Sequence, residues 1–81
     1  MSAVTLYRRE DCHLCEEARE VLEDLRAEGR FELHEVDIES SDALFRAYLE
    51  RIPVVAVDGV VVAELTPDRD ELRVALGLGS P

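Results

Sequence analysis

The order of apolar and polar positions along the 81-residue chain predicts first a strand and then an amphipathic helix. Residues 3–7 (Ala-Val-Thr-Leu-Tyr) are a short run of strand-forming residues, which suits a central strand covered on both faces. From Cys12 the pattern becomes helical, and Gly29 offers a left-handed end to the helix. The apolar stripe of this helix comprises Leu14, Cys15, Ala18, Val21, Leu22 and Leu25.

The middle of the chain predicts a second strand and a short helix. In the strand, residues 31–38, both faces are partly apolar, so it either packs on two sides or contains an irregularity. Ser40, Ser41 and Asp42 are good N-cap residues for the helix that follows. Its apolar face is marked by Leu44, Phe45, Tyr48 and Leu49.

The last third predicts a hairpin and a final helix. Pro53 opens a third strand, residues 54–57, at a position where a missing N–H is tolerated. Asp58-Gly59 is a two-residue turn signal, and residues 60–65 form the fourth strand. Thr66 as N-cap and Pro67 as the first helical residue start the last helix. Gly77 ends it, and residues 77–81 are expected to be a loose tail of this single domain, residues 1–81.

The element order is therefore β-α-β-α-β-β-α, which predicts an α/β fold. The first two strands are joined through a helix, so they pair in parallel with a right-handed crossover. The last two strands form an antiparallel hairpin. We expect a four-stranded mixed sheet flanked by three helices.

Charge excludes some classes of partner. Nineteen acidic residues stand against nine basic ones, a net charge of −10, and the nine bases are all Arg and scattered. No patch could neutralise a run of phosphates, so nucleic acid is not an expected partner. No apolar run approaches the roughly 20 residues of a membrane span, and the N-terminus lacks the regions of a signal peptide. We expect a cytoplasmic monomer.

The chemistry that stands out is the pair Cys12 and Cys15, the only cysteines of the chain. Three residues turn a helix by roughly 300°, so both side chains lie on nearly the same face, within reach of a disulfide. A helix start also favours thiolate over thiol, which lowers the pKa of Cys12. Two alternatives stay open: the cysteines are small packing residues, or they bind zinc together with His13 and His34.

With a C-x-x-C opening the first helix and Ile52-Pro53 opening the third strand, this order resembles the thioredoxin fold in its smallest form. More narrowly, the chain resembles a glutaredoxin-like protein. The residues that carry the resemblance are Thr5-Leu6-Tyr7, Cys12-His13-Leu14-Cys15, Ile52-Pro53-Val54-Val55 and Asp58-Gly59.

The resemblance implies that Cys12 is the nucleophile of a thiol–disulfide oxidoreductase and that Cys15 resolves the mixed disulfide. It also implies that Pro53 is cis and faces the disulfide, and that the backbone of Ile52 pairs with a substrate chain. No bound cofactor is implied; electrons would come from glutathione or a thioredoxin-type reductase. The alternative is a binding or redox-sensing module that keeps the thioredoxin fold without turnover.

The chain also departs from glutaredoxins that use glutathione. His13-Leu14 replaces their Pro-Tyr pair, and Ala63-Glu64 replaces a Gly-Gly turn that lets the backbone approach the ligand. Thr66-Pro67 replaces the Ser-Asp pair, so that Asp68, one place late, would supply the carboxylate for the amino group of glutathione. We therefore expect glutathione to be a poor partner.

Around the two cysteines we expect the disulfide-containing protein or small thiol substrate to be bound. Arg8 and Arg9 would favour the Cys12 thiolate and meet an anionic partner, whereas nearby carboxylates such as Glu16 oppose them. His13 either acts on the thiolate in its charged form or simply faces solvent. The full set of candidate binding residues is Arg8, Arg9, His13, Leu14, Ile52, Pro53, Thr66 and Asp68.

Overall fold

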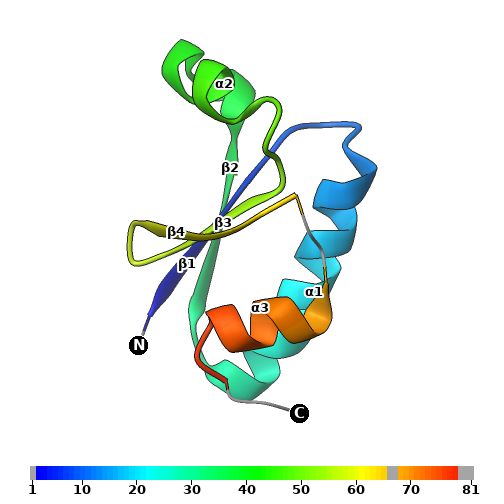
Figure 1. The fold of residues 1–81 in the computed structure, drawn as a ribbon, viewed down its shortest axis with the longest axis vertical. Helices are drawn as coiled ribbons and strands as arrows, with labels where there is room; N and C mark the ends of the chain where they lie inside the picture. The colour runs from blue at the N-terminus through cyan, green and yellow to red at the C-terminus, as the bar shows by residue number, and fades with distance from the viewer. Residues whose placement is uncertain (1, 66–67, 79–81) are drawn as a thin grey trace.

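The computed structural model describes residues 2–65 and 68–78 of the chain. The elements follow the predicted order (Figure 1). One additional 3-10 turn, η1, lies between β2 and α2. The strands are β1 (Ala3–Arg8), β2 (Glu32–Asp37), β3 (Val54–Val57) and β4 (Val60–Glu64), and the helices are α1 (His13–Gly29), η1 (Ile38–Ser40), α2 (Asp42–Tyr48) and α3 (Arg69–Ala75). None of the described helices has the length and apolar character needed to cross a membrane.

The sheet has the order β2-β1-β3-β4. β1 pairs in parallel with β2 and antiparallel with β3, and β3 pairs antiparallel with β4. The predicted α/β fold with a four-stranded mixed sheet and a closing hairpin is therefore confirmed. β1, the first strand in the chain, lies in the interior of the sheet, so its end is flanked by β2 on one side and β3 on the other.

Helices α1 and α3 pack against one face of the sheet and against each other (Figure 1). Two ion pairs join them, Arg69–Asp24 at 2.7 Å and Arg73–Glu28. The buried side chains of this main core are Val4, Leu6, Ala18, Leu22, Leu25, Phe31, Val55, Ala63 and Leu72. This main core holds α1 in a fixed position on the sheet, and with it the cysteine pair at the start of the helix.

A second, smaller core lies where β1 ends and β3 begins. Its buried members are Cys15, Ile38, Ile52 and Val54. Helix α2 covers it, and Tyr48 of α2 stacks on Tyr7 of β1 with ring centroids 4.8 Å apart. Cys15 is thus part of a hydrophobic core, while the main core lies further along α1.

Three details at the ends of α1 differ from the prediction. Leu14, assigned to the apolar stripe, is 43% exposed, because the first turn of α1 extends past the edge of the core. Gly29 is still helical, and the left-handed residue is Arg30 (φ 50°, ψ 53°). Gly29 serves packing instead, because a Cβ there would lie 2.7 Å from Leu78 Cδ2. Leu78, assigned to a loose tail, therefore packs on the main core. Residues 79–81 of that tail lie outside the described residues.

For the second strand, the sequence left two possibilities, packing on both faces or an irregularity, and the structure shows the irregularity. β2 is an edge strand whose own side chains are exposed or half-buried, so it does not pack on two sides. The two strongly apolar ends of the predicted strand lie outside it: Phe31 precedes β2, and Ile38 begins η1 and is buried in the second core. Of the three predicted caps of α2, Ser41 takes the position, because its hydroxyl accepts a hydrogen bond from Leu44 N–H.

The hairpin forms as predicted, but α3 starts later than predicted. Asp58 and Gly59 both have positive φ, 49° and 87°, as a type I′ turn requires. The N-cap of α3 is Asp68, not Thr66, since the Asp68 carboxylate accepts a 3.0 Å hydrogen bond from Glu71 N–H. Thr66 and Pro67 lie outside the described residues. Leu76 and Gly77, with φ 75° at the glycine, end the helix.

Candidate functional site

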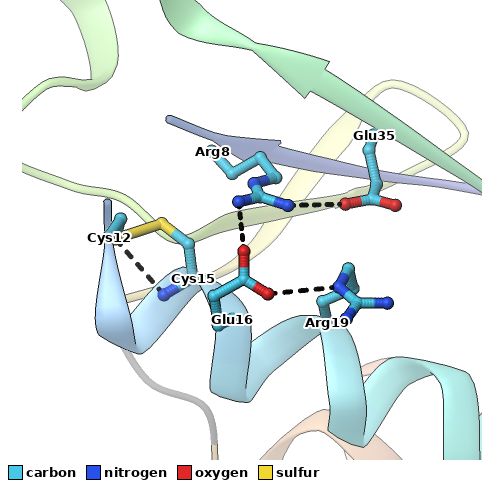
Figure 2. Close-up of polar contacts among 6 residues, drawn as sticks. All are labelled: Arg8, Cys12, Cys15, Glu16, Arg19 and Glu35. Carbon is cyan, nitrogen blue, oxygen red and sulfur yellow. Dashed lines mark hydrogen bonds and ion pairs between the residues drawn. A yellow bond between two sulfur atoms is a disulfide. The ribbon is translucent and has the colours of Figure 1, made fainter. Parts of the chain in front are cut away.

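The cysteine pair sits at the first turn of α1, where the chain leaves the interior strand β1. Asp11 has a left-handed backbone (φ 59°), which Asp tolerates better than most residues, and it turns the chain into the helix. Cys12 is the N-cap, and its Sγ accepts a 3.2 Å hydrogen bond from Cys15 N–H. The two cysteines form a disulfide with Cα atoms 5.2 Å apart, within the usual range (Figure 2).

The two sulfurs have different surroundings. Cys15 is fully buried in the second core, whereas Cys12 is only partly buried and lines an open hollow together with Asp11, His13 and Glu16. A molecule that approaches from solvent therefore meets Cys12 first. The Cys15 N–H and the start of a 17-residue helix both point to Cys12 Sγ, a placement that favours a thiolate there when the disulfide is open.

Beside the disulfide, an ion-pair network joins the end of β1 to α1 and β2 (Figure 2). Arg8 donates one hydrogen bond to Glu16 and a second, 3.1 Å long, to Glu35. Arg19 contacts the other carboxylate oxygen of Glu16 at 3.4 Å. The Arg8 side chain is only 20% exposed. This network fixes the carboxylate of Glu16 on the side of α1 that adjoins the sheet.

The network changes the pKa of both partners. The hydrogen bond from Arg8 holds the pKa of Glu16 below its ordinary value, against a smaller opposing effect of desolvation. Desolvation alone would lower the pKa of Arg8, but its hydrogen bonds with Glu35 and Glu16 outweigh this and raise it. Both groups are therefore firmly charged at neutral pH. Sequence reasoning missed Glu35, which no local spacing connects to Arg8, whereas the i,i+3 spacing of Glu16 and Arg19 could have shown that pair.

Arg9 and His13 are also paired within the chain. Arg9 contacts Glu39 at 3.3 Å and lies over the ring of Phe45, 5.9 Å from its centroid. The His13 side chain is 90% exposed, with Nε2 3.7 Å from Glu17. His34, a candidate zinc ligand, lies on β2 beside Glu32 at 3.9 Å. Among residues 2–65 and 68–78, no three His, Cys, Asp or Glu side chains are grouped as a metal site would need.

Ile52 and Pro53 lie with the cysteines. Ile52 belongs to the same buried core as Cys15, Pro53 is fully buried, and the peptide bond between them is cis. The Ile52 N–H is engaged, however, because it donates a 3.0 Å hydrogen bond to the carbonyl of Tyr48. The expectation of an unoccupied Ile52 backbone is therefore wrong for its N–H. The last turn of α2 takes up this donor.

The remaining candidates lie around α3 and the helix start. Asp68 caps α3, and its position fits a role in starting that helix. Thr66 lies outside the described residues. Leu14 follows His13 on the exposed first turn of α1. The structure thus brings Cys12, Cys15, Ile52, Pro53, Arg8 and Glu16 to one end of the sheet.

Comparison with known proteins agrees with this architecture. A family described as "Glutaredoxin-like domain (DUF836)" matches residues 3–77 of the chain. The structure of protein XcR50 from X. campestris is 36% identical in sequence, with a TM-score of 0.78, and the match covers 94% of this chain and 97% of that one. Protein Ne2328 from Nitrosomonas europaea is 31% identical, with a TM-score of 0.77 and coverage of 90% and 88%.

More distant structures share the fold alone. A mutant thioredoxin from Halobacterium salinarum is 21% identical, with a TM-score of 0.71, and the match covers 99% of this chain and 75% of that one. No curated protein matches the sequence.

Proposed function

Because the chain belongs to the glutaredoxin-like domain family, we propose that it is a small thiol–disulfide oxidoreductase that works through Cys12 and Cys15. The observation that carries the proposal is the asymmetry of the disulfide. One sulfur lines an open hollow at a helix start, and the other is buried behind it. A merely structural disulfide needs no such difference, whereas a reaction in two steps does.

In the first step the Cys12 thiolate attacks one sulfur of a substrate disulfide. An S–S bond to Cys12 forms, the substrate S–S bond breaks, and one substrate thiolate leaves. In the second step the Cys15 thiolate attacks Cys12 Sγ and expels the second substrate thiolate. The protein then carries the Cys12–Cys15 disulfide, and the substrate has gained two electrons. Glutathione or a thioredoxin-type reductase would return the protein to the dithiol.

Several neighbours have supporting roles in this proposal. The Cys15 N–H stabilises the Cys12 thiolate before it attacks the substrate disulfide. Ile52 and Pro53 shape the apolar wall around Cys15, which limits solvent access to the resolving thiol. A cytoplasmic location would suit this chemistry, because thiols are kept reduced there. With glutathione, turnover would be weak.

The test is reduction of a model protein disulfide such as that of insulin by the purified protein, with dithiothreitol as the electron source. The wild type should accelerate reduction, and Cys12→Ser should not. Cys15→Ser should accumulate a mixed disulfide at Cys12, visible by mass. If the wild type and Cys12→Ser are equally slow, the chain is a binding or redox-sensing module instead. Replacing dithiothreitol by glutathione or thioredoxin reductase, each with NADPH recycling, identifies the electron donor.

A further inference from the structure

The surface around Cys12 carries an excess of negative charge. Two hollows lie near it: one at the ends of β1 and β2, lined by Arg8, Arg9, Glu10, Glu35 and Asp37, and one at the start of α1, lined by Asp11, Cys12, His13 and Glu16. The ion pair between Arg8 and Glu16 connects them. Together they hold five carboxylates and two guanidinium groups, a formal charge of −3 when His13 is neutral. The whole chain, at −10, adds to this field.

The two positive charges at this surface are already paired inside the molecule. Arg8 is held between Glu16 and Glu35, and Arg9 between Glu39 and the ring of Phe45. An anionic substrate would have to compete with these carboxylates for the two guanidinium groups.

Three of the five carboxylates, those of Glu10, Asp11 and Asp37, are exposed and take part in no ion pair within the described part of the chain. The Asp37 carboxylate is engaged in another way, because it accepts a 2.8 Å hydrogen bond from Glu39 N–H at the start of η1, so Glu10 and Asp11 remain available. Asp11 is adjacent to Cys12 in sequence and lines the same hollow. The negative charge of Asp11 therefore lies close to the substrate residues that flank the sulfur attacked by Cys12.

We infer, on the basis of the proposed function, that the substrate is a polypeptide whose disulfide is flanked by Lys or Arg, and that Asp11 and Glu10 select it. A cationic residue next to the reacting disulfide would lie over the hollow and pair with these two carboxylates. An anionic disulfide, such as that of glutathione, meets repulsion from the same groups.

Two synthetic peptides of equal length test this, each with one intramolecular disulfide, flanked by two Lys residues in one and by two Glu residues in the other. The rate at which the reduced protein reduces each peptide is divided by the rate with dithiothreitol, which removes differences in intrinsic reactivity. An exposed charge pair contributes about 1 kcal/mol in water, so the Lys peptide should be favoured about 5-fold or more at low salt. The preference should shrink at 1 M salt, where the Debye length is about 3 Å.

The variants Asp11→Asn and Glu10→Gln should each reduce this preference. Asn suits position 11 because it tolerates the left-handed backbone there. Glu20→Gln is the matched control: it removes one exposed charge from α1, about 12 Å further along the helix axis than Cys12, and should reduce the preference far less than Asp11→Asn or Glu10→Gln when all are compared at about 0.1 M salt, where the Debye length is about 10 Å.

Equal normalised rates for the two peptides, or a preference for the Glu peptide, would overturn the inference and leave the oxidoreductase proposal standing. An unchanged preference in both Asp11→Asn and Glu10→Gln would overturn the assignment to these carboxylates. If neither peptide, nor insulin, is reduced in a Cys12-dependent manner, the proposed function itself fails, and the inference fails with it.

Discussion

In the reduced protein, Cys12 should react with iodoacetamide faster than Cys15. A hydrogen bond to a charged acceptor is worth about 1.5–3 kcal/mol. The Cys15 N–H, which donates to Cys12 Sγ in the disulfide, would donate such a bond to the Cys12 thiolate. The helix start adds about 0.3–1 kcal/mol. The lower limits together enrich the thiolate on the order of 20-fold. Starting from an ordinary thiol pKa of about 8.5, this raises the thiolate fraction at pH 7 roughly 13-fold. Because nucleophilicity falls with pKa at a Brønsted slope of about 0.4–0.5, a net gain of roughly 3-fold in rate remains. Burial of Cys15 widens the difference further.

The assay is brief labelling at pH 7 followed by trypsin digestion and mass spectrometry. Both cysteines lie in one tryptic peptide, residues 10–19, so fragment ions must locate the label. In Cys12→Ser, Cys15 should label slowly in the native protein and rapidly in guanidinium, which separates burial from intrinsic reactivity. Equal labelling of the two cysteines, or faster labelling of Cys15, would refute the assignment of nucleophile and resolving thiol.

Three further predictions concern the frame of the site. Arg8 lowers the folded-state pKa of Glu16, so the ion pair stabilises the fold at pH values above the unfolded pKa of Glu16. This stabilisation is lost as pH falls through the lower, folded-state pKa. Glu16→Gln should therefore flatten the acid side of a plot of Tm against pH. Leu22→Ala, in the main core, should lower the unfolding free energy by about 2–5 kcal/mol in a urea titration. Gly59→Ala should cost about 1–2 kcal/mol by the same measurement, since φ is 87° there, whereas Val60→Ala on the exposed side should cost less.

Elements that depend on local signals could be predicted from the sequence. The bounds of β3 agree with the prediction, because Pro53 before it and Asp58-Gly59 after it mark both ends. Cys12 as the start of α1 and Ser41 as the cap of α2 are also confirmed, since each is set by a residue and its neighbours within one turn. The C-x-x-C spacing likewise fixes the 5.2 Å separation of the two Cα atoms through helix geometry alone.

What could not be predicted depends on contacts between residues far apart in sequence. Gly29 has the pattern of a helix end, yet its role is set by Leu78, which approaches from beyond α3. Ile38 continues the apolar alternation of β2 but turns into η1, because the second core at that end of the sheet offers it burial. Arg8 and Glu35 are 27 residues apart, and only the parallel pairing of β1 with β2 brings them together.

The same distinction separates the cysteine pair from the charges around it. The disulfide is local, since Cys12 and Cys15 share one helical turn. The charge that a substrate meets is the sum over β1, α1 and β2, after some groups have cancelled one another. Arg8 and Arg9 look like an anion-binding pair in the sequence, but the fold places Glu16, Glu35 and Glu39 against them. The groups left to act on a substrate are then Glu10 and Asp11, which is why the substrate inferred here is cationic.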